Sequence, residues 1–340
     1  MLNITLAATA AITSVGLTAA QTAASVRAGI CRNRTFAYQT SCSSSSSGLF
    51  EASVPDDCLP VMDRQMPPLE KRLLQLTGAT AGQLAHIKLA DIPLVVGLAP
   101  GAFAGHSDPD ILHMMAEQLG ATIAPGGSRV IKEGRAAGLI AIEHACKLIA
   151  DNKADSVLAG GCDTFHDPDL LGRLNIANRI KSRTAMDFFV PGEGAGFVLL
   201  KRSDPEPLAQ IWAGATGFEP GHPGSAQPYR ATALADTIGI VCRPLSDKIA
   251  TLFAGMNGES HWAKEWANAL LRCSEHFDPA MALYHPAEYY GDAGAACGPI
   301  MTALAVIGMR RGYLRGPALV YASSDQGPHC VIGVNTVRSQ

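Results

Sequence analysis

Residues 133–164, EGRAAGLIAIEHACKLIADNKADSVLAGGCDT, carry the pattern that decides the fold. Residues 136–150 are mostly strong helix formers, and apolar side chains cover most of the helix circumference, which is typical of a buried helix. Residues 156–159 form a short apolar run that ends at Gly160-Gly161, and this run favours a buried strand. A buried helix followed by a tight loop and a buried strand predicts an α/β protein.

The composition limits the classes of function. The chain has 340 residues, 47% of them hydrophobic and 17% charged, with a net charge of −3. That length and apolar content suffice for a large core, as one domain or two closely packed halves. The near-neutral charge gives no reason to expect binding to nucleic acid or an anionic membrane. Nine cysteines without CxxC spacing predict free thiols in a reducing cytoplasm.

The first twenty residues, MLNITLAATAAITSVGLTAA, are apolar and resemble a signal peptide at first sight. They carry no Lys or Arg, and Thr13, Ser14 and Gly16 interrupt the apolar run, so we expect a core strand and the start of a helix instead. No run approaches the ~20 apolar residues of a membrane span. The sequence therefore predicts no membrane span.

The rest of the chain alternates between strand and helix patterns. The strand patterns cover residues 3–11, 93–98, 210–215, 252–258, 318–322 and 330–334. The helix patterns cover residues 18–27, 69–76, 108–119, 231–242, 262–273 and 289–308, with Ser107 as a predicted N-cap. The two comparable series predict a duplicated α/β topology.

Three segments resemble the β-ketoacyl synthases of the thiolase superfamily. In that family a nucleophilic cysteine opens a buried helix, and a strand that ends in two glycines follows. Here ACKLI (145–149) resembles part of that helix, and LAGG (158–161) resembles the end of that strand. VPGEGAGFVLL (190–200) resembles the family's glycine-rich turn into a strand, and YYGDAGAACG (289–298) resembles a second conserved helix start. The resemblance implies a five-layer αβαβα thiolase-like fold built from two similar halves, residues 1–205 and 206–340.

The family's catalytic residues are replaced in this chain. The resemblance places Arg135 at the nucleophilic cysteine, Asp292 at one catalytic histidine and Glu259, within NGES (257–260), at the other. If that loop is shifted, His261 takes the histidine's place. Condensation requires a thiolate and two bases. We therefore predict a vestigial site without catalytic residues, in which Arg135, Glu259 and Asp292 form a charged cluster.

Other candidate nucleophiles have simpler explanations. TSCSSS (40–45) resembles a polyketide synthase nucleophile motif, but no buried helix follows it, so Cys42 is predicted to lie on the surface. Cys146, Cys297 and His144 fit core positions. The rival hypothesis is an enzyme, a divergent synthase or acyltransferase that uses His261 or Cys162. The histidines show no metal-ligand spacing, so neither a metal nor a cofactor is expected.

The resemblance implies a protein that acts by binding, as a scaffold or adaptor subunit. One context is a chain-length-factor-like subunit paired with an active ketosynthase. The other is the ketosynthase-like group found beside type VI secretion effector genes, which the short chain, the segment SVGLTAAQTAASVRAGI and the NGE turn favour. The expected partner is a secretion effector or a related ketosynthase. The protein is predicted to be a homodimer or heterodimer through residues 121–131.

Overall fold

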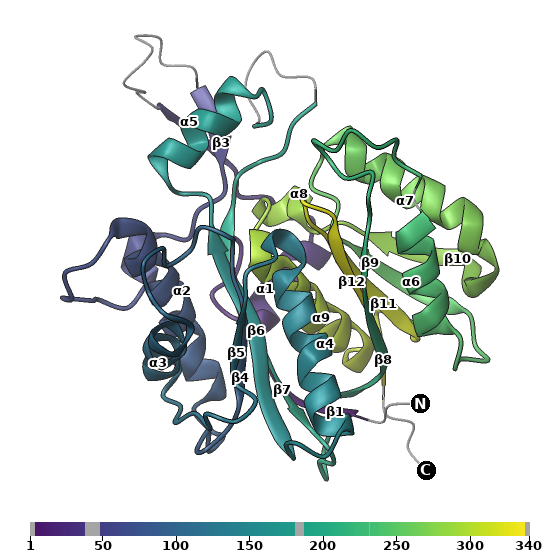
Figure 1. Ribbon diagram of the computed structural model, residues 1–340, viewed down its shortest axis with the longest axis horizontal. Coiled ribbons are helices and arrows are strands. Elements are labelled where there is room, and N and C mark those ends of the chain that lie inside the picture. Colours follow the sequence, from purple (N-terminus) through teal and green to yellow (C-terminus); the bar gives the residue numbers. More distant parts are fainter. Residues whose placement is uncertain (1–3, 38–47, 181–186, 231, 337–340) are drawn as a thin grey trace.

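The computed structural model describes residues 4–37, 48–180, 187–230 and 232–336. Ten strands form one sheet in the order β10-β9-β11-β12-β8-β1-β7-β6-β4-β5, and β2 pairs with β3 in a separate hairpin (Figure 1). The strands are β1 (Ile4–Thr13), β2 (Arg34–Ala37), β3 (Gly48–Glu51), β4 (Leu94–Gly97), β5 (Arg129–Ile131), β6 (Ser156–Thr164), β7 (Glu193–Lys201), β8 (Ala209–Phe218), β9 (Ile249–Ala254), β10 (Phe277–Tyr284), β11 (Ala318–Ser323) and β12 (Pro328–Asn335).

The same five-strand connectivity occurs twice. In the first half β1 is antiparallel to β7, β7 is antiparallel to β6, β6 is parallel to β4, and β4 is parallel to β5. Strands β8, β12, β11, β9 and β10 repeat this pattern in the second half, and antiparallel pairing of β1 with β8 joins the two. The predicted fold of two similar halves is confirmed. The division after residue 205 falls between β7 and β8 and stays a prediction.

Helices lie in three layers around the two half-sheets. α4 (Ala137–Ala150) and α9 (Cys297–Arg310) form the middle layer and share one core with α1 (Ala19–Arg27). α2 (Pro68–Leu84) and α3 (Asp108–Leu119) cover the outer face of the first half-sheet, and α6 (Thr232–Cys242) and α7 (Ser260–Cys273) cover that of the second. This is the predicted αβαβα order. The remaining helices are α5 (Pro168–Ile176), α8 (Ala287–Tyr290) and four short 3₁₀ turns, η1 (Asp56–Cys58), η2 (Gly134–Ala136), η3 (Ser274–His276) and η4 (Gly294–Ala296).

The two middle helices begin close together. Each follows a 3₁₀ turn, η2 or η4, that opens with a glycine at positive φ, 62° at Gly134 and 52° at Gly294. A Cβ on Gly138 would lie 2.2 Å from the Ala295 carbonyl oxygen, and a Cβ on Gly298 would lie 2.7 Å from Leu139 Cβ. Only glycine permits so close a crossing, and it brings both helix starts to one point at the centre of the molecule.

Two glycine runs that we expected at strand ends lie inside strands. Gly160 and Gly161 lie within β6, and residues 193–196 of the GEGAG segment form the first part of β7 instead of a turn. A Cβ at Gly160 would approach the Gly196 carbonyl oxygen to 2.1 Å, and one at Gly196 would lie 2.9 Å from the Ile300 nitrogen in α9. These glycines therefore serve close packing between neighbouring strands and against the central helix.

Several other expectations need correction. The single helix predicted over residues 289–308 is broken between α8 and η4, where Gly291 has a φ of 76°. The hairpin β2–β3, α5 and β10 were missed, and α2 is longer than predicted. Cys42 lies outside the described residues. Within those residues, no helix is long and apolar enough to cross a membrane.

A small lobe stands above the first half-sheet, where β3 and α5 lie together (Figure 1). The fully buried carboxylate of Glu193, at the start of β7, joins the segments around this lobe to the sheet and to α2. This carboxylate accepts hydrogen bonds from Arg72 Nε at 2.9 Å, from the Val54 nitrogen at 2.7 Å and from Thr164 Oγ1 at 2.9 Å. The lobe matters for function because α5 forms one wall of the central cavity.

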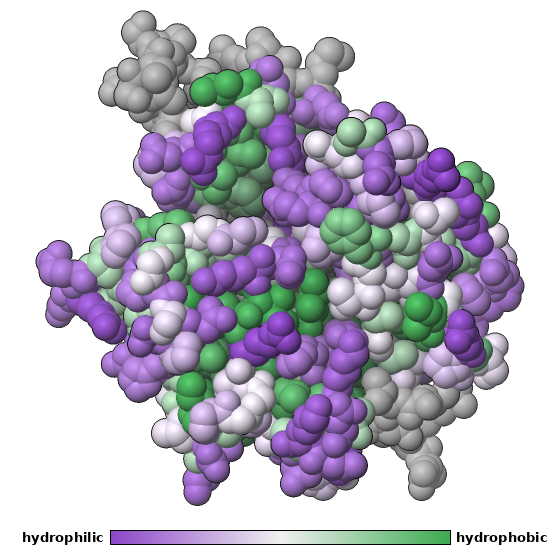
Figure 2. Space-filling model, viewed as in Figure 1, coloured by the Kyte–Doolittle hydropathy of each residue, from purple (hydrophilic) through white to green (hydrophobic). Residues whose placement is uncertain are grey.

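Strands β5 and β10 form the two edges of the ten-stranded sheet. The face of the molecule over β5 and α4 carries apolar side chains between polar ones (Figure 2). Ile140 and His144, one turn apart on α4, are both half-buried. This face therefore combines an open strand edge with partly exposed apolar surface.

Candidate functional site

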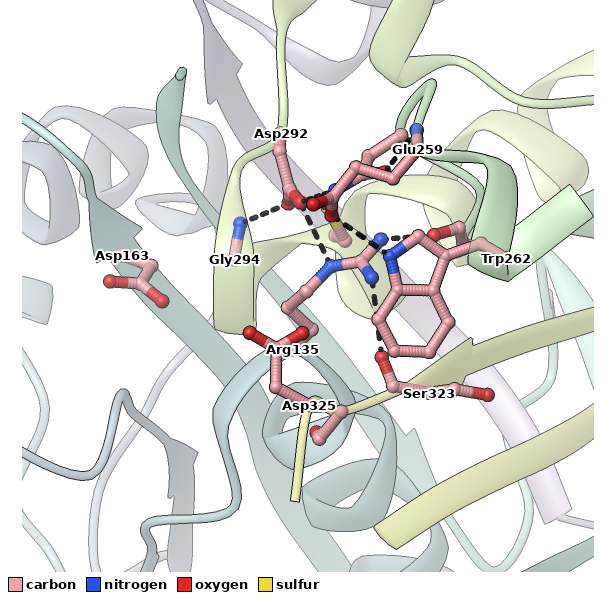
Figure 3. Close-up of polar contacts among 12 residues, drawn as sticks. Arg135, Asp163, Glu259, Trp262, Asp292, Gly294, Ser323 and Asp325 are labelled. Carbon is pink, nitrogen blue, oxygen red and sulfur yellow. Dashed lines mark hydrogen bonds and ion pairs between the residues drawn. The ribbon is translucent and has the colours of Figure 1, made fainter. Parts of the chain in front are cut away.

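Arg135 lies at the inner start of α4 and is buried. Its Nε lies 2.9 Å from Asp292 Oδ2, and its guanidinium carbon lies 4.7 Å from the centre of the Trp262 ring (Figure 3). The Gly255 carbonyl accepts a hydrogen bond from Nη2. Burial lowers the pKa of Arg135, but nearby negative charge, that of Asp292 above all, raises it above its ordinary value. The side chain is therefore a permanently charged, fixed group.

Asp292 has a full set of partners. It lies just before η4, and its Oδ1 accepts from the Gly294 nitrogen at 2.9 Å while its Oδ2 accepts from Asn257 Nδ2 at 2.8 Å. The Cys297 thiol also points to Oδ1, at 3.5 Å. Buried ion pairs persist only when additional hydrogen bonds satisfy the remaining lone pairs, as they do here.

Glu259 takes a different cation from Asp292. Its two carboxylate oxygens lie 2.7 and 2.9 Å from Arg179 Nε and Nη2 in a bidentate pair, and Arg179 also contacts Asp325 at 2.6 Å. Asn257 Nδ2 donates to Glu259 as well as to Asp292 and so links the two ion pairs. The predicted cluster of three charges is therefore two linked pairs, because Arg179, which sequence reasoning missed, approaches from the segment after α5.

Asp163 is a second residue that sequence reasoning missed. It lies near the end of β6, where its Oδ2 accepts from the Ala295 nitrogen and its Oδ1 from the Thr164 nitrogen, both at 2.9 Å. Burial raises the pKa of Asp163 to about 7. Its position at the carboxyl end of β6 was an available signal, because ligands of α/β sheets bind at the carboxyl ends of strands.

A cavity of about 250 Å³ opens beside these charged groups. One wall is ionic, and the other is apolar and includes Phe165 and Phe189, whose rings meet edge to face at 5.2 Å. A cavity of this kind suits a small ligand that is apolar at one end. Its lining consists of Ala99, Pro100, Gly134, Arg135, Asp163, Phe165, Leu170, Leu174, Arg179, Phe189, Asp292, Asp325 and Gln326.

No thiol of the described residues lines this cavity. Cys162 faces the core below α2, and burial raises the pKa of its thiol to about 12. Burial also raises the thiol pKa of Cys146 and of Cys297, and the neighbouring Asp292 carboxylate raises that of Cys297 further. None of the three is activated as a nucleophile, since activation requires a lowered thiol pKa.

His261 packs against aromatic rings. Its ring centroid lies 5.2 Å from that of Tyr229 and 4.8 Å from that of Trp262, and burial lowers its pKa. It is not among the residues that line the cavity. Among the described residues, no cluster of three or more His, Cys, Asp or Glu side chains is arranged to hold a metal ion.

Comparison with known proteins gives a family match for one part of the chain. Residues 124–205 match the family described as Beta-ketoacyl synthase, N-terminal domain. The chain is 28% identical over 182 residues to the non-reducing polyketide synthase adaA of Aspergillus niger, covering 46% of this chain. It is also 28% identical over 219 residues to the phthioceranic/hydroxyphthioceranic acid synthase of Mycobacterium tuberculosis, covering 51% of this chain. The chain spans about a tenth of the length of these relatives.

Solved structures match over almost the whole chain. One is AntDE:AntF, a type II polyketide acyl-carrier protein in complex with its ketosynthase, with a TM-score of 0.79, 15% identity and coverage of 98% of this chain and 99% of that chain. Another is the ishigamide ketosynthase/chain length factor, with a TM-score of 0.78, 15% identity and 99% coverage of both chains. The protein therefore has the thiolase-like ketosynthase fold.

Proposed function

We propose that this protein is a non-catalytic ketosynthase-like subunit that acts by binding another protein. The observation that carries the proposal is the buried pair of Arg135 and Asp292. A cation lies where the resemblance places the nucleophile, and its counter-ion lies where the resemblance places a base. Replacement of the nucleophile by a cation and of the base by an anion supports a site that stabilises the fold or binds a ligand without catalysis.

The chemistry of these groups supports the absence of condensation. A guanidinium stays protonated and carries no nucleophilic lone pair for an acyl group. Asp292 is engaged by Arg135, Asn257 and the Gly294 nitrogen, so it is not placed to take a proton from a substrate. The cavity beside them keeps an apolar wall, which is compatible with binding without turnover. No metal or cofactor is part of this proposal, and we expect the protein to work in the cytoplasm.

An acylation experiment separates this proposal from the rival enzyme. The protein is incubated with acetyl-, malonyl- and octanoyl-CoA and its intact mass is measured, with an active ketosynthase treated in parallel as a positive control. We expect no covalent acyl adduct on this protein. An adduct that maps to Cys162, His261 or another side chain would refute the binding role and favour a divergent β-ketoacyl synthase or acyltransferase.

A chain-length-factor-like role is the second candidate. It is favoured by the likeness to the ishigamide ketosynthase/chain length factor, which covers nearly all of both chains. In that role the partner is an active ketosynthase, and the edge at β5 supplies a heterodimer contact. In the adaptor role the partner is a secretion effector, and the same edge supplies a homodimer contact.

Partner identification distinguishes the two roles. The tagged protein is expressed in its native host, cross-linked and purified, and its partners are identified by mass spectrometry. An Ile140→Glu variant, altered on the α4 face, serves as the control. Recovery of a ketosynthase that depends on Ile140 supports the chain-length-factor role, and recovery of a secretion effector supports the adaptor role. Recovery of neither contradicts both.

A further inference from the structure

A second concave site lies away from the central cavity, where the second half of α1 meets the second half of α9. It contains a pocket of about 140 Å³ whose aromatic lining is Phe253, Tyr284, Tyr289 and Tyr313. Three of the chain's seven tyrosines therefore gather here, in a protein with only 6% aromatic residues. Such a concentration is typical of sites that bind flat apolar groups.

The aromatic rings form a structured box. Phe253 and Tyr284 are stacked, with ring centroids 5.0 Å apart and an interplanar angle of 18°. The Arg27 guanidinium carbon lies 4.5 Å from the centre of the Tyr313 ring and so closes one side of the pocket by a cation–π contact. Val26, Leu304 and Leu314 complete the apolar floor.

A wider hollow of about 290 Å³ adjoins the box. The two share the lining residues Ala23, Arg27 and Tyr313 and so lie side by side, and we call the two together the α1–α9 groove. The hollow is lined mainly by alanines of α1 and by Ile307 and Arg311 of α9. Small side chains therefore line the hollow, and Arg27 and Arg311 lie at its boundary.

The charge in the groove is not balanced locally. Arg27 and Arg311 both lie on its edge and are exposed. Among the described residues, neither forms an ion pair with a carboxylate within 4.0 Å, whereas Arg135 and Arg179, which line the central cavity, both do. Two unneutralised guanidinium groups beside an aromatic box complement a ligand that joins an anion to a flat ring.

We propose that the α1–α9 groove binds a small molecule that carries an aromatic ring and a carboxylate or phosphate. The ring enters the box between Tyr284, Tyr289 and Tyr313, and the anion lies between Arg27 and Arg311. The groove shares no lining residue with the cavity at Arg135, so the inference does not depend on the proposed function.

Isothermal titration calorimetry with three probes tests the site. 3-Phenylpropionate and phenyl phosphate carry ring and anion, and 3-phenyl-1-propanol carries the ring alone. We expect at least one anionic probe to bind at least tenfold more tightly than the alcohol, and the tighter of the two identifies the preferred anion. No heat from either anion at millimolar concentration would refute the proposal, as would equal binding of the alcohol.

Variants locate the binding to the groove. Arg27→Gln and Tyr289→Leu should each weaken the anionic probe at least fivefold, and Arg311→Gln should weaken it while leaving the alcohol unchanged. Arg230→Gln, an exposed arginine outside the groove, is the matched control and should bind like the parent protein. Equal loss in the Arg230→Gln protein would show non-specific attraction and overturn the assignment. Circular dichroism verifies that each variant is folded.

Discussion

Arg135 Nε lies 2.9 Å from Asp292 Oδ2, at the point where the two central helices of the two halves begin. Both side chains are buried, with 9% and 1% of their surface exposed. A charge in such a place depends on its partner, because water cannot replace the lost interaction. The pair therefore ties the stability of the fold to the same two positions that the resemblance assigns to catalysis.

Replacing Arg135 by methionine should destabilise the protein strongly. Methionine keeps much of the volume but leaves the Asp292 carboxylate buried without its cation. Loss of one partner of a buried pair costs about 3–5 kcal/mol. Urea unfolding followed by circular dichroism measures the difference.

The double variant Arg135→Met/Asp292→Asn is the informative comparison. It removes both charges and keeps a side chain that can accept from the Gly294 nitrogen, so it should be more stable than Arg135→Met alone. Arg202→Met, at an exposed pair with Asp155, should change stability by less than about 1 kcal/mol. Equal stability of Arg135→Met and the parent would show that the pair is not structural.

Glu265 makes the stability depend on pH. This buried side chain in α7 has an Oε2 without a hydrogen-bond partner among the described residues. Burial raises its pKa from 4.5 to about 7. Between these values the folded protein keeps a proton that the unfolded chain has lost, so its contribution to stability falls as pH rises from about 4.5 to about 7.

The Glu265→Gln substitution removes the contribution of Glu265 to the pH dependence of stability. The variant should match the parent near pH 5 and be more stable by on the order of 1–3 kcal/mol at pH 8, because glutamine carries no charge to bury. Thermal unfolding between pH 5 and 9 gives the difference curve. A flat difference across that range would contradict the assignment. Asp163 titrates in the same window, so the variant's stability still falls with rising pH, with a smaller slope than that of the parent protein.

Cysteine accessibility gives a third prediction. At pH 8 iodoacetamide should modify Cys31, which is exposed, and Cys58, which is half-buried, but not the buried thiols Cys146, Cys162 and Cys297. A Cys42→Ser background removes the thiol that lies outside the described residues. Peptide mass spectrometry reads the sites. Rapid alkylation of Cys297 would show that the thiol beside Asp292 is reachable and would reopen an enzymatic role.

Gly138→Ala should destabilise the crossing of the central helices. The new Cβ would lie 2.2 Å from the Ala295 carbonyl oxygen, so backbone must move, and overpacking of this kind costs about 1–3 kcal/mol or more. Gly82→Ala is the matched control, because this glycine also lies within a helix and has nothing within 4 Å of the added atom. There alanine should stabilise by about 0.5–1 kcal/mol. A change in stability of the same sign for Gly138→Ala and Gly82→Ala would argue against the tight helix crossing.

The predicted dimer contact rests on the edge strand β5 and the adjoining face of α4. Sedimentation velocity at about 1–50 μM, at or above the micromolar-to-picomolar dissociation constants of standard-size interfaces, should show a dimer of the parent chain or, with a ketosynthase partner, a heterodimer. Ile140→Glu should shift the species to monomer while leaving the circular dichroism spectrum unchanged. A monomer at every concentration, with or without that partner, would remove the contact.

Much of the fold was predictable because its signals are local. The apolar pattern of residues 136–150 marks α4, and Thr18 and Ser107 cap α1 and α3 as side-chain acceptors. The prediction was wrong at Gly160 and in GEGAG, where glycines expected at a strand end or in a turn lie inside strands. A glycine that ends a strand and a glycine that admits a neighbouring segment look alike in sequence, and only the packing of β6 on β7 and of β7 on α9 distinguishes them.

The site was predictable only in part, because its geometry is not local. Arg135 and Asp292 were found through the resemblance of two helix starts to those of the β-ketoacyl synthases. Arg179 follows a short helix, α5, that sequence reasoning missed, and it reaches Glu259 from another part of the chain. Trp262 is only the first residue of the helix predicted over residues 262–273, and nothing in the sequence shows that its ring covers a guanidinium. Contacts of this kind arise from tertiary packing and leave no spacing to detect.

The crossing at Gly138 and Gly298 has a kinetic consequence. With helix backbones in contact at that point, the inner wall of the central cavity cannot open by a hinge between the halves without breaking the packing of α4 on α9. The half-exposed Arg179, held by Glu259 and Asp325, is the part of the rim that side-chain rotation alone can move. We therefore expect rotation of Arg179, which breaks both ion pairs, to be the motion that widens the mouth of this cavity, so exchange of a bound molecule should accelerate with ionic strength.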